Sequence, residues 1–259
     1  MATEFAGKVI VVTGGAEQVW GEGLTAAEAL LRAGASVFIW DDDADALARA
    51  EVELCDQGLR ADLRQVDIAD EAQVRRAYDA VRNAGGRVDG LVNAAVLKNS
   101  FLMGPENPYP YRHVDFWNLV PERFRRIIDV NVLGMYLCTS VVARDMVARK
   151  SGSIINVSTS DRTKTSPKNI AYGPSKAMVE AFSLAAARQL KAHGVRLNVI
   201  CADGRVNHRH MTNPENQPFD VMVPVIRYLL GDGSKDVYGQ VFSAAEFNRS
   251  FTGERGAAR

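Results

Sequence analysis

Residues 8–15 read Lys8-Val9-Ile10-Val11-Val12-Thr13-Gly14-Gly15. Five successive β-branched residues, 9–13, predict a strand that is buried on both faces, as in a parallel sheet, and the two glycines predict a tight turn directly after it. Helix-forming residues with apolar positions on one face follow from Leu24 to Arg32, and Gly34 ends this helix. A second strand, 36–40, leads into three acidic residues, 41–43. The segment is therefore a β-α-β unit with glycines in its first turn.

This unit predicts a dinucleotide site. Gly14, Gly21 and Gly23 lie in the first turn, where glycines let the backbone approach a pyrophosphate and the helix N-terminus faces its charge. Asp41 stands 18 residues beyond Gly23, the position of a carboxylate that accepts hydrogen bonds from the adenosine ribose. A carboxylate there would repel a 2′-phosphate, so Asp41 predicts NAD rather than NADP.

The alternation of strands and helices continues along the chain. We expect further strands near 63–66, 88–95, 153–158, 196–201 and 240–242, and helices near 71–83, 121–149, 172–193 and 221–230. Since no linker, low-complexity run or repeat divides the chain, this pattern predicts a single α/β domain, a doubly wound parallel sheet of about seven strands. Ligands bind such sheets at the carboxyl ends of the strands. The polar residues expected there are Thr13, Asp41, Asp67, Asn93 and Ser158 to Ser160.

A second motif, Tyr172-Gly173-Pro174-Ser175-Lys176, places a phenol and an amine four residues apart. If a helix begins near Pro174, the two side chains lie one turn apart on the same face. A free tyrosine titrates near ~10, but an ammonium about 4 Å away at an effective dielectric of ~20 favours the phenolate by roughly 4 kcal/mol, or about three pH units. The pair would then transfer protons at neutral pH. The same spacing alone also fits a half-buried aromatic residue beside a solvated lysine.

The composition excludes several classes of protein. With 31 basic and 31 acidic residues among 259, the chain has no electrostatic footprint for nucleic acid or an anionic membrane. The start is no signal peptide and no apolar run reaches the ~20 residues of a membrane span, so we expect a cytoplasmic protein. The three cysteines are too few and scattered for disulfides or zinc. His208 and His210 have no third ligand near them in sequence, so we expect solvated loop residues and no metal.

Taken together, these residues resemble the short-chain dehydrogenase/reductase family from about Lys8 to Ala244. The landmarks are Thr13-Gly14 with Gly21-x-Gly23, Asp67, Asn93-Ala94-Ala95, Asn131, the run Gly152 to Ser158, Tyr172-x-x-x-Lys176 and Gly239-Gln240-Val241. The resemblance implies a Rossmann-like fold over residues 1–247, and the glycines and charges of 248–259 predict a mobile tail or a subunit contact. The resemblance also implies an NAD-dependent oxidoreductase that interconverts a secondary alcohol and a ketone by hydride transfer.

The resemblance implies a role for each matching residue. Tyr172 would be the general acid/base, Lys176 would lower its pKa and bind the nicotinamide ribose, and Asn131 would hold a water in the proton relay. The family's substrate-orienting serine position falls on Thr159, and we favour Thr159 over its neighbour Ser160. The cofactor-binding residues would be Gly14, Gly21, Gly23, Asp41, Asp67, Ile68, Asn93, Tyr172 and Lys176.

The chain departs from the family pattern in several places. Gly14 and Gly21 are separated by six residues where the family has three, so we expect a longer, bulged turn around Gln18 to Trp20. The turn after the fourth strand ends in Val96 instead of a glycine. After the sixth strand the family's Pro-Gly is replaced, and no site role is carried beyond Val206. The aromatic and proline-rich segment 98–117 is longer than usual, which fits either a lid over the crevice or a surface or oligomer contact.

Two other functions stay open. A catalytically weak dinucleotide-binding protein is suggested by the altered glycine turn and by Thr159 at the serine position. An NADPH-dependent ketone reductase is the third hypothesis, which Asp41 disfavours. Helices 121–149 and 172–193 commonly bury against other subunits in this family, so we expect a homotetramer or homodimer. The expected partner is a small alcohol or ketone substrate.

Overall fold

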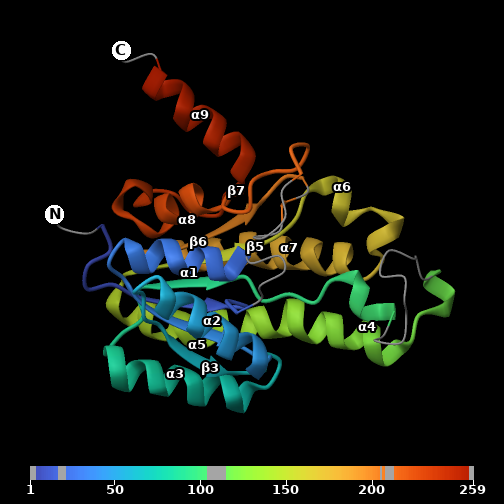
Figure 1. Cartoon of the computed structure of the whole chain (residues 1–259), viewed down its shortest axis with the longest axis horizontal. Helices are drawn as coiled ribbons and strands as arrows, with labels where there is room; N and C mark the ends of the chain where they lie inside the picture. The colour runs from blue at the N-terminus through green and yellow to red at the C-terminus, as the bar shows by residue number, and fades with distance from the viewer. Residues whose placement is uncertain (1–3, 17–21, 104–114, 205, 208–212, 257–259) are drawn as a thin grey trace.

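The fold is a seven-stranded parallel sheet with helices on both faces, as the sequence predicts (Figure 1). The computed structural model describes residues 4–16, 22–103, 115–204, 206–207 and 213–256. The strand order is β3-β2-β1-β4-β5-β6-β7, so the order in which strands are added to the sheet reverses between the neighbours β1 and β4, the place where doubly wound sheets bind ligands. The strands are β1 Val9–Thr13, β2 Ser36–Asp41, β3 Asp62–Gln65, β4 Gly90–Asn93, β5 Gly152–Val157, β6 Val195–Cys201 and β7 Val241–Ser243.

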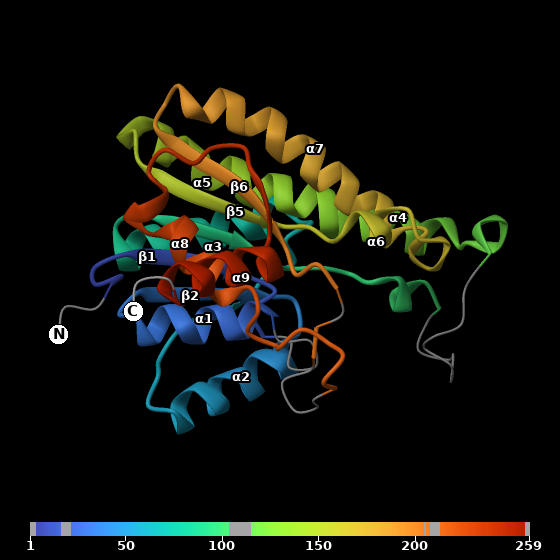
Figure 2. The same ribbon diagram turned by 90° about the horizontal axis from the view of Figure 1, so that it is seen from above.

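The two faces of β1 belong to two hydrophobic cores, which explains its continuous apolar sequence. Ile10 and Val12 pack with buried residues of α1, α2 and α8, whereas Val9 and Val11 pack with those of α3, α5 and α7. Figure 2 shows these helices layered along the sheet from above. The α-helices are α1 Glu22–Arg32, α2 Ala44–Asp56, α3 Glu71–Gly85, α4 Pro121–Ile128, α5 Met135–Arg149, α6 Asp161–Lys164, α7 Tyr172–Lys191, α8 Val223–Leu230 and α9 Ala244–Gly256.

The long helix expected over 121–149 is interrupted by a π-helical turn. The π-helix Asp129–Gly134 separates α4 from α5, and such turns concentrate at functional sites because they redirect side chains. Gly134 lies against the loop after β3, since a Cβ there would come within 2.6 Å of the Ile68 side chain. By length and composition, 121–149 is also apolar enough to cross a membrane, but 56% of its most apolar window is buried inside the protein. This burial indicates a core helix rather than a span.

Three α-helices, α2, α6 and α9, were not expected from the sequence. Helix α2 begins after Asp43, whose carboxylate accepts a hydrogen bond from the Ala46 N–H at 2.9 Å, a typical N-cap. Helix α9 runs from Ala244 to Gly256, so residue 247, the boundary expected from the sequence, lies inside a helix. Figure 1 shows α9 extending away from the sheet. Short 3₁₀ helices, Asn99–Met103 and Phe116–Asn118, form the two ends of the aromatic segment, whose residues 104–114 lie outside the described part.

Candidate active site

A cavity of about 500 Å³ opens at the carboxyl ends of β1 to β4. This volume is within the range of small-molecule and cofactor sites. Four of the residues predicted to bind a cofactor line it: Gly14, Asp41, Asp67 and Ile68. Trp40 also lines it, and its buried indole N–H has no hydrogen-bond partner among the described residues. No sequence pattern indicates this donor, because a strand tryptophan is ordinarily a core residue.

The glycine turn packs too closely for any side chain. Gly14 has φ +65°, and a Cβ there would lie 2.4 Å from the Ala95 Cα. A Cβ on Gly23 would lie 2.3 Å from the Gly14 carbonyl oxygen. The start of α1 is therefore held directly against the end of β1, which leaves backbone N–H groups at the helix N-terminus for an anion. Gly21 and the extra residues Gln18 to Trp20 lie outside the described residues.

Asp41 is anchored by the backbone beside this turn. Its Oδ2 accepts from the Ala16 N–H at 3.0 Å and its Oδ1 from the Asp43 N–H at 3.1 Å. Burial raises the pKa of this carboxyl, and these two hydrogen bonds oppose the rise. Each oxygen keeps a further lone pair for a ligand hydroxyl. Asp41 therefore orders the turn and also lines the cavity.

Arg126 of α4 is a site residue that sequence reasoning missed. Its guanidinium pairs with Asp67 at 2.9 Å and with Asp42 at 3.4 Å, so it partly neutralises the acidic rim of the cavity. The Asp67 carboxylate is also fixed through its Oδ1, which accepts from the Ala69 N–H at 3.0 Å. No local pattern could indicate this contact, because about 60 to 85 residues separate Arg126 from the two acids.

Tyr172 and Lys176 lie one turn apart at the start of α7, as their spacing predicts. The Lys176 side chain is buried, and its Nζ donates to the Val157 carbonyl at 2.7 Å. Burial lowers the pKa of Lys176 to about 8, although the Glu22 carboxylate opposes this shift. The ammonium is therefore held at the end of β5, beside the catalytic candidate.

The predicted acidification of Tyr172 is wrong for the protein alone. Its pKa is raised, first by burial and then by the Glu22 carboxylate, and a hydrogen bond with Thr159 lowers it only in part. An ammonium at contact distance favours the phenolate, but the loss of water on burial disfavours it and has the larger effect here. Glu22, the first residue of α1, was not expected near the tyrosine.

The structure brings Thr159, and not Ser160, to Tyr172. Thr159 hydrogen-bonds the phenol, whereas the Ser160 hydroxyl lies 3.1 Å from the Thr163 hydroxyl in the turn that begins α6. Two adjacent residues of an extended segment point in opposite directions, so only one of them can face the phenol.

Asn131 and Asn93 occupy different surroundings. Asn131 lies in the π-helix and is buried; its Oδ1 accepts from the Leu97 N–H at 2.7 Å, and its Nδ2 donates to the Leu97 carbonyl at 3.0 Å and the Ser175 hydroxyl at 2.9 Å. It therefore joins the loop after β4 to α7. The Asn93 amide instead donates to Asn156 at 2.8 Å and to Thr139 at 3.0 Å. Asn93 thus connects β4 with β5 and α5 and is absent from the cavity lining.

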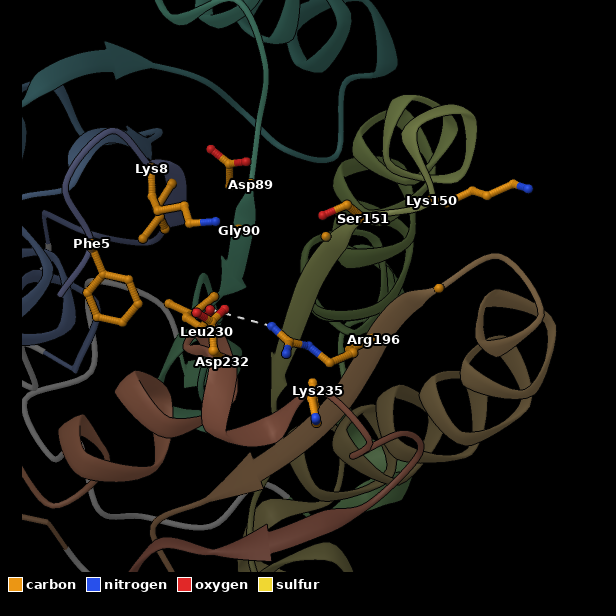
Figure 3. Close-up of a pocket in the computed structure, with 13 residues that line it drawn as sticks. Phe5, Lys8, Asp89, Gly90, Lys150, Ser151, Arg196, Leu230, Asp232 and Lys235 are labelled. Atoms are coloured by element: carbon orange, nitrogen blue, oxygen red, sulfur yellow. Dashed lines mark hydrogen bonds between the residues drawn. The ribbon is translucent and has the colours of Figure 1, made fainter.

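A second, polar cavity of about 200 Å³ lies at the amino ends of the strands, opposite the first cavity (Figure 3). Lys8, Arg196 and Lys235 reach it from separate segments, and the Arg196 guanidinium donates to the Leu230 carbonyl at 3.4 Å. None of the predicted site residues borders it. Among the described residues, no group of three His, Cys, Asp or Glu side chains could hold a metal; His208 and His210 lie outside that part of the chain.

This chain is similar to known dehydrogenases over most of its length. The short chain dehydrogenase family model matches residues 8–217. A short-chain dehydrogenase/reductase of Pyricularia oryzae is 31% identical over 258 residues, covering 92% of this chain and 90% of the relative. A 2-dehydro-3-deoxy-L-rhamnonate dehydrogenase (NAD(+)) of a Sphingomonas species is 29% identical, with 77% and 72% covered.

A solved structure has the same fold. The gluconate 5-dehydrogenase of Burkholderia cenocepacia J2315, in complex with NADP and tartrate, superposes with a TM-score of 0.76 at 23% identity, covering 93% of this chain and 95% of that one. The family model spans most of the chain, from the glycine turn through Tyr172 and Lys176. The chain therefore belongs to the short-chain dehydrogenase family, whose members are oxidoreductases acting on alcohols.

Proposed function

We propose that the protein is an NAD-dependent oxidoreductase that interconverts a secondary alcohol and a ketone, with Tyr172 as the general acid/base. The observation that carries this proposal is the contact between Thr159 and Tyr172, one helical turn from the buried Lys176. A hydroxyl, a phenol and an amine therefore lie together at the carboxyl ends of the strands of a doubly wound sheet. Residues 1–247 would form the catalytic domain, in the cytoplasm.

The residues present fit a dinucleotide. Gly14 and Gly23 leave no room for side chains in the turn, and Asp41, Asp67, Ile68 and Trp40 line the adjacent cavity. Asp41 would bind the adenosine ribose and Asp67 the purine amino group. Bound NAD supplies a nicotinamide carbon that accepts or returns a hydride.

Side chains of the protein itself would transfer the proton and position the reacting groups. The Thr159 hydroxyl would orient the substrate oxygen, and the Tyr172 phenol would donate a proton to a ketone or remove one from an alcohol. Lys176 would hold the nicotinamide ribose, and Asn131 would fix the loop after β4 next to α7. Because burial raises the pKa of Tyr172, the phenol stays protonated at neutral pH, which favours reduction of the ketone. Oxidation of the alcohol should accelerate as the pH rises.

Tyr172→Phe tests the proposal, with Tyr238→Phe as the control, because the Tyr238 ring lies against Lys191 at the other end of α7. Turnover of a panel of secondary alcohols and ketones is measured with each cofactor, and NAD binding is measured by calorimetry. We expect loss of turnover with unchanged NAD affinity in Tyr172→Phe only. A Phe variant with wild-type activity would refute the role of the phenol. NAD binding by a wild-type protein that turns over no substrate would favour a catalytically weak dinucleotide-binding protein.

NADPH-dependent ketone reduction is the second candidate. Arg126 neutralises part of the acidic rim at Asp42 and Asp67, and both Asp41 oxygens already accept backbone hydrogen bonds. These contacts reduce the repulsion that Asp41 alone predicts. Comparing kcat/KM for NADH and NADPH separates the two, and a higher value for NADPH would overturn the NAD assignment.

We also propose that the protein is a homodimer or homotetramer. Leu133, Tyr136 and Met178 are large apolar residues with 41%, 44% and 48% of their surface exposed. They lie on the helices expected at subunit contacts, and the Tyr136 ring packs edge-on against Phe182 across α5 and α7 at 5.8 Å. Contiguous exposed apolar residues mark interaction surfaces. Sedimentation equilibrium at micromolar concentration measures the assembly.

A further inference from the structure

A shielded ion pair joins α6 to α7 beside the Tyr172 site. The Lys164 ammonium of α6 donates to Glu180 of α7 and to Asp161 at 2.9 Å. The Lys164 and Glu180 side chains retain only 11% and 22% of their exposure, whereas Asp161 is 97% exposed. Since screening weakens exposed pairs, the contact with Glu180 is the stronger of the two.

Helix α6 is also pressed against the first turn of α7. A Cβ on Gly173 would lie 2.6 Å from the carbonyl oxygens of Thr163 and Lys164. This approach is possible only because residue 173, next to Tyr172, has no side chain. Figure 1 shows α6 beside the end of α7 where Tyr172 begins the helix. The segment is thus attached to α7 at two points.

Thr159 lies on the same segment, between β5 and α6. Its predecessor Ser158 is buried, and the Ser158 hydroxyl lies 3.3 Å from the Lys176 carbonyl and 3.4 Å from Glu180 Oε2. Glu180 therefore contacts one residue before Thr159 in the sequence, Ser158, and one after it, Lys164. Thr159, which hydrogen-bonds Tyr172, lies between these two anchored residues in the sequence.

We propose that Lys164 and Glu180 are positioning residues that fix the Thr159 hydroxyl relative to the Tyr172 phenol. This inference rests on the proposed function, because it assigns the pair an effect on the step that Thr159 and Tyr172 perform. The pair does not touch the dinucleotide cavity, so it acts on turnover and not on cofactor affinity. A misplacement of about 1 Å at a reacting group lowers rates by about 10²-fold.

A role in stability alone predicts a different result. Removing one partner of a shielded ion pair destabilises a protein, whereas replacing both by apolar residues of similar size is often neutral. Lys164→Met/Glu180→Met should therefore melt close to the wild type. If the pair positions Thr159, this double variant still has a low kcat, because the methionines pack without holding a fixed geometry.

The test measures kcat, substrate KM, NAD affinity and melting temperature for Lys164→Met, Glu180→Gln and the double variant. Arg162→Met is the matched control, since Arg162 is an exposed cation of the same short helix. We expect kcat to fall about 10- to 100-fold in the three variants, with NAD affinity unchanged and Arg162→Met like the wild type. Lys164→Arg keeps the cation and should recover most of the loss.

Two results would overturn the inference. One is a double variant with wild-type kcat, which would assign the pair to stability. The other is a loss of NAD affinity as large as the loss of kcat, which would place the effect in the cofactor site. Tyr172→Phe is assayed in parallel: if it stays active, the proposed function fails, whereas an inactive Tyr172→Phe with fully active Lys164 and Glu180 variants rejects only the positioning role.

Discussion

Lys176→Met should change how the stability of the protein depends on pH. The Lys176 side chain is 3% exposed, and burial lowers its pKa from the ordinary 10.5 to about 8. The folded protein therefore binds this proton less tightly than the unfolded chain does. Between about pH 8 and 10.5 the unfolded chain binds more protons, so wild-type stability from this group rises with pH across that window.

The size of the effect follows from the two pKa values. At ~1.36 kcal/mol per pH unit, the drop from 10.5 to about 8 destabilises the fold by about 3 kcal/mol below pH 8. About 1 kcal/mol of this is relieved between pH 7 and 9. Methionine has no such dependence. The substitution also leaves the Val157 carbonyl without its 2.7 Å partner, at a cost of about 1–3 kcal/mol that does not vary with pH.

Urea unfolding at pH 7 and pH 9 measures the difference. The wild type should gain about 1 kcal/mol relative to Lys176→Met on going from pH 7 to 9. Lys235→Met is the control, because Lys235 is exposed. The free energy of unfolding of this variant should change between pH 7 and 9 by the same amount as that of the wild type. Wild-type and Lys176→Met curves that stay parallel across this range would refute the reasoning, since they would show that the amine titrates alike in both states.

Three further substitutions test other parts of the site. Thr159→Ala should lower kcat about 10²-fold in steady-state assays while Ser160→Ala remains active, and the reverse order would reject Thr159. Asp41→Ser should raise the NADP/NAD ratio of kcat/KM at least about tenfold by removing like-charge repulsion, and an unchanged ratio would contradict its role. Gly14→Ala should abolish NAD binding in calorimetry, because its Cβ would lie 2.4 Å from the Ala95 Cα; binding at wild-type affinity would show that the turn adapts.

The sheet was predictable because its strands are encoded locally. Val9 to Val12 are buried on both sides of the sheet, so their sequence alone indicates a central parallel strand. The π-helix was not predictable, because no sequence pattern in residues 129–134 specifies a π-helical turn and its position depends on contacts with Ile68 and Leu97. Helix α2 carries a local start, the Asp43 cap, which the prediction overlooked.

Some features of the candidate site could likewise be predicted from local sequence, and others could not. The four-residue spacing of Tyr172 and Lys176 is a property of one helix and could be predicted. The direction of the Tyr172 pKa shift could not, because it depends on burial and on Glu22, which α1 brings from 150 residues away in sequence. Arg126 and the Lys164–Glu180 pair were missed for the same reason, because their charged partners are distant in sequence and become neighbours only in the folded protein.

The π-helix connects the two halves of the proposed site. Leu97 and Val130 line the cavity beside Asp41 and Asp67, and Asn131 binds both backbone groups of Leu97 while its amide donates to Ser175 in the first turn of α7. Ser175 in turn donates to the Tyr172 carbonyl at 2.7 Å. A contiguous set of hydrogen bonds therefore runs from the cavity wall to the backbone of the proposed acid/base. Because buried amides such as Asn131 are costly to leave unpaired, a ligand that shifts Leu97 must shift Asn131 as well. The geometry of the phenol thus depends on the loop that would hold the cofactor, although the two are 75 residues apart in the chain.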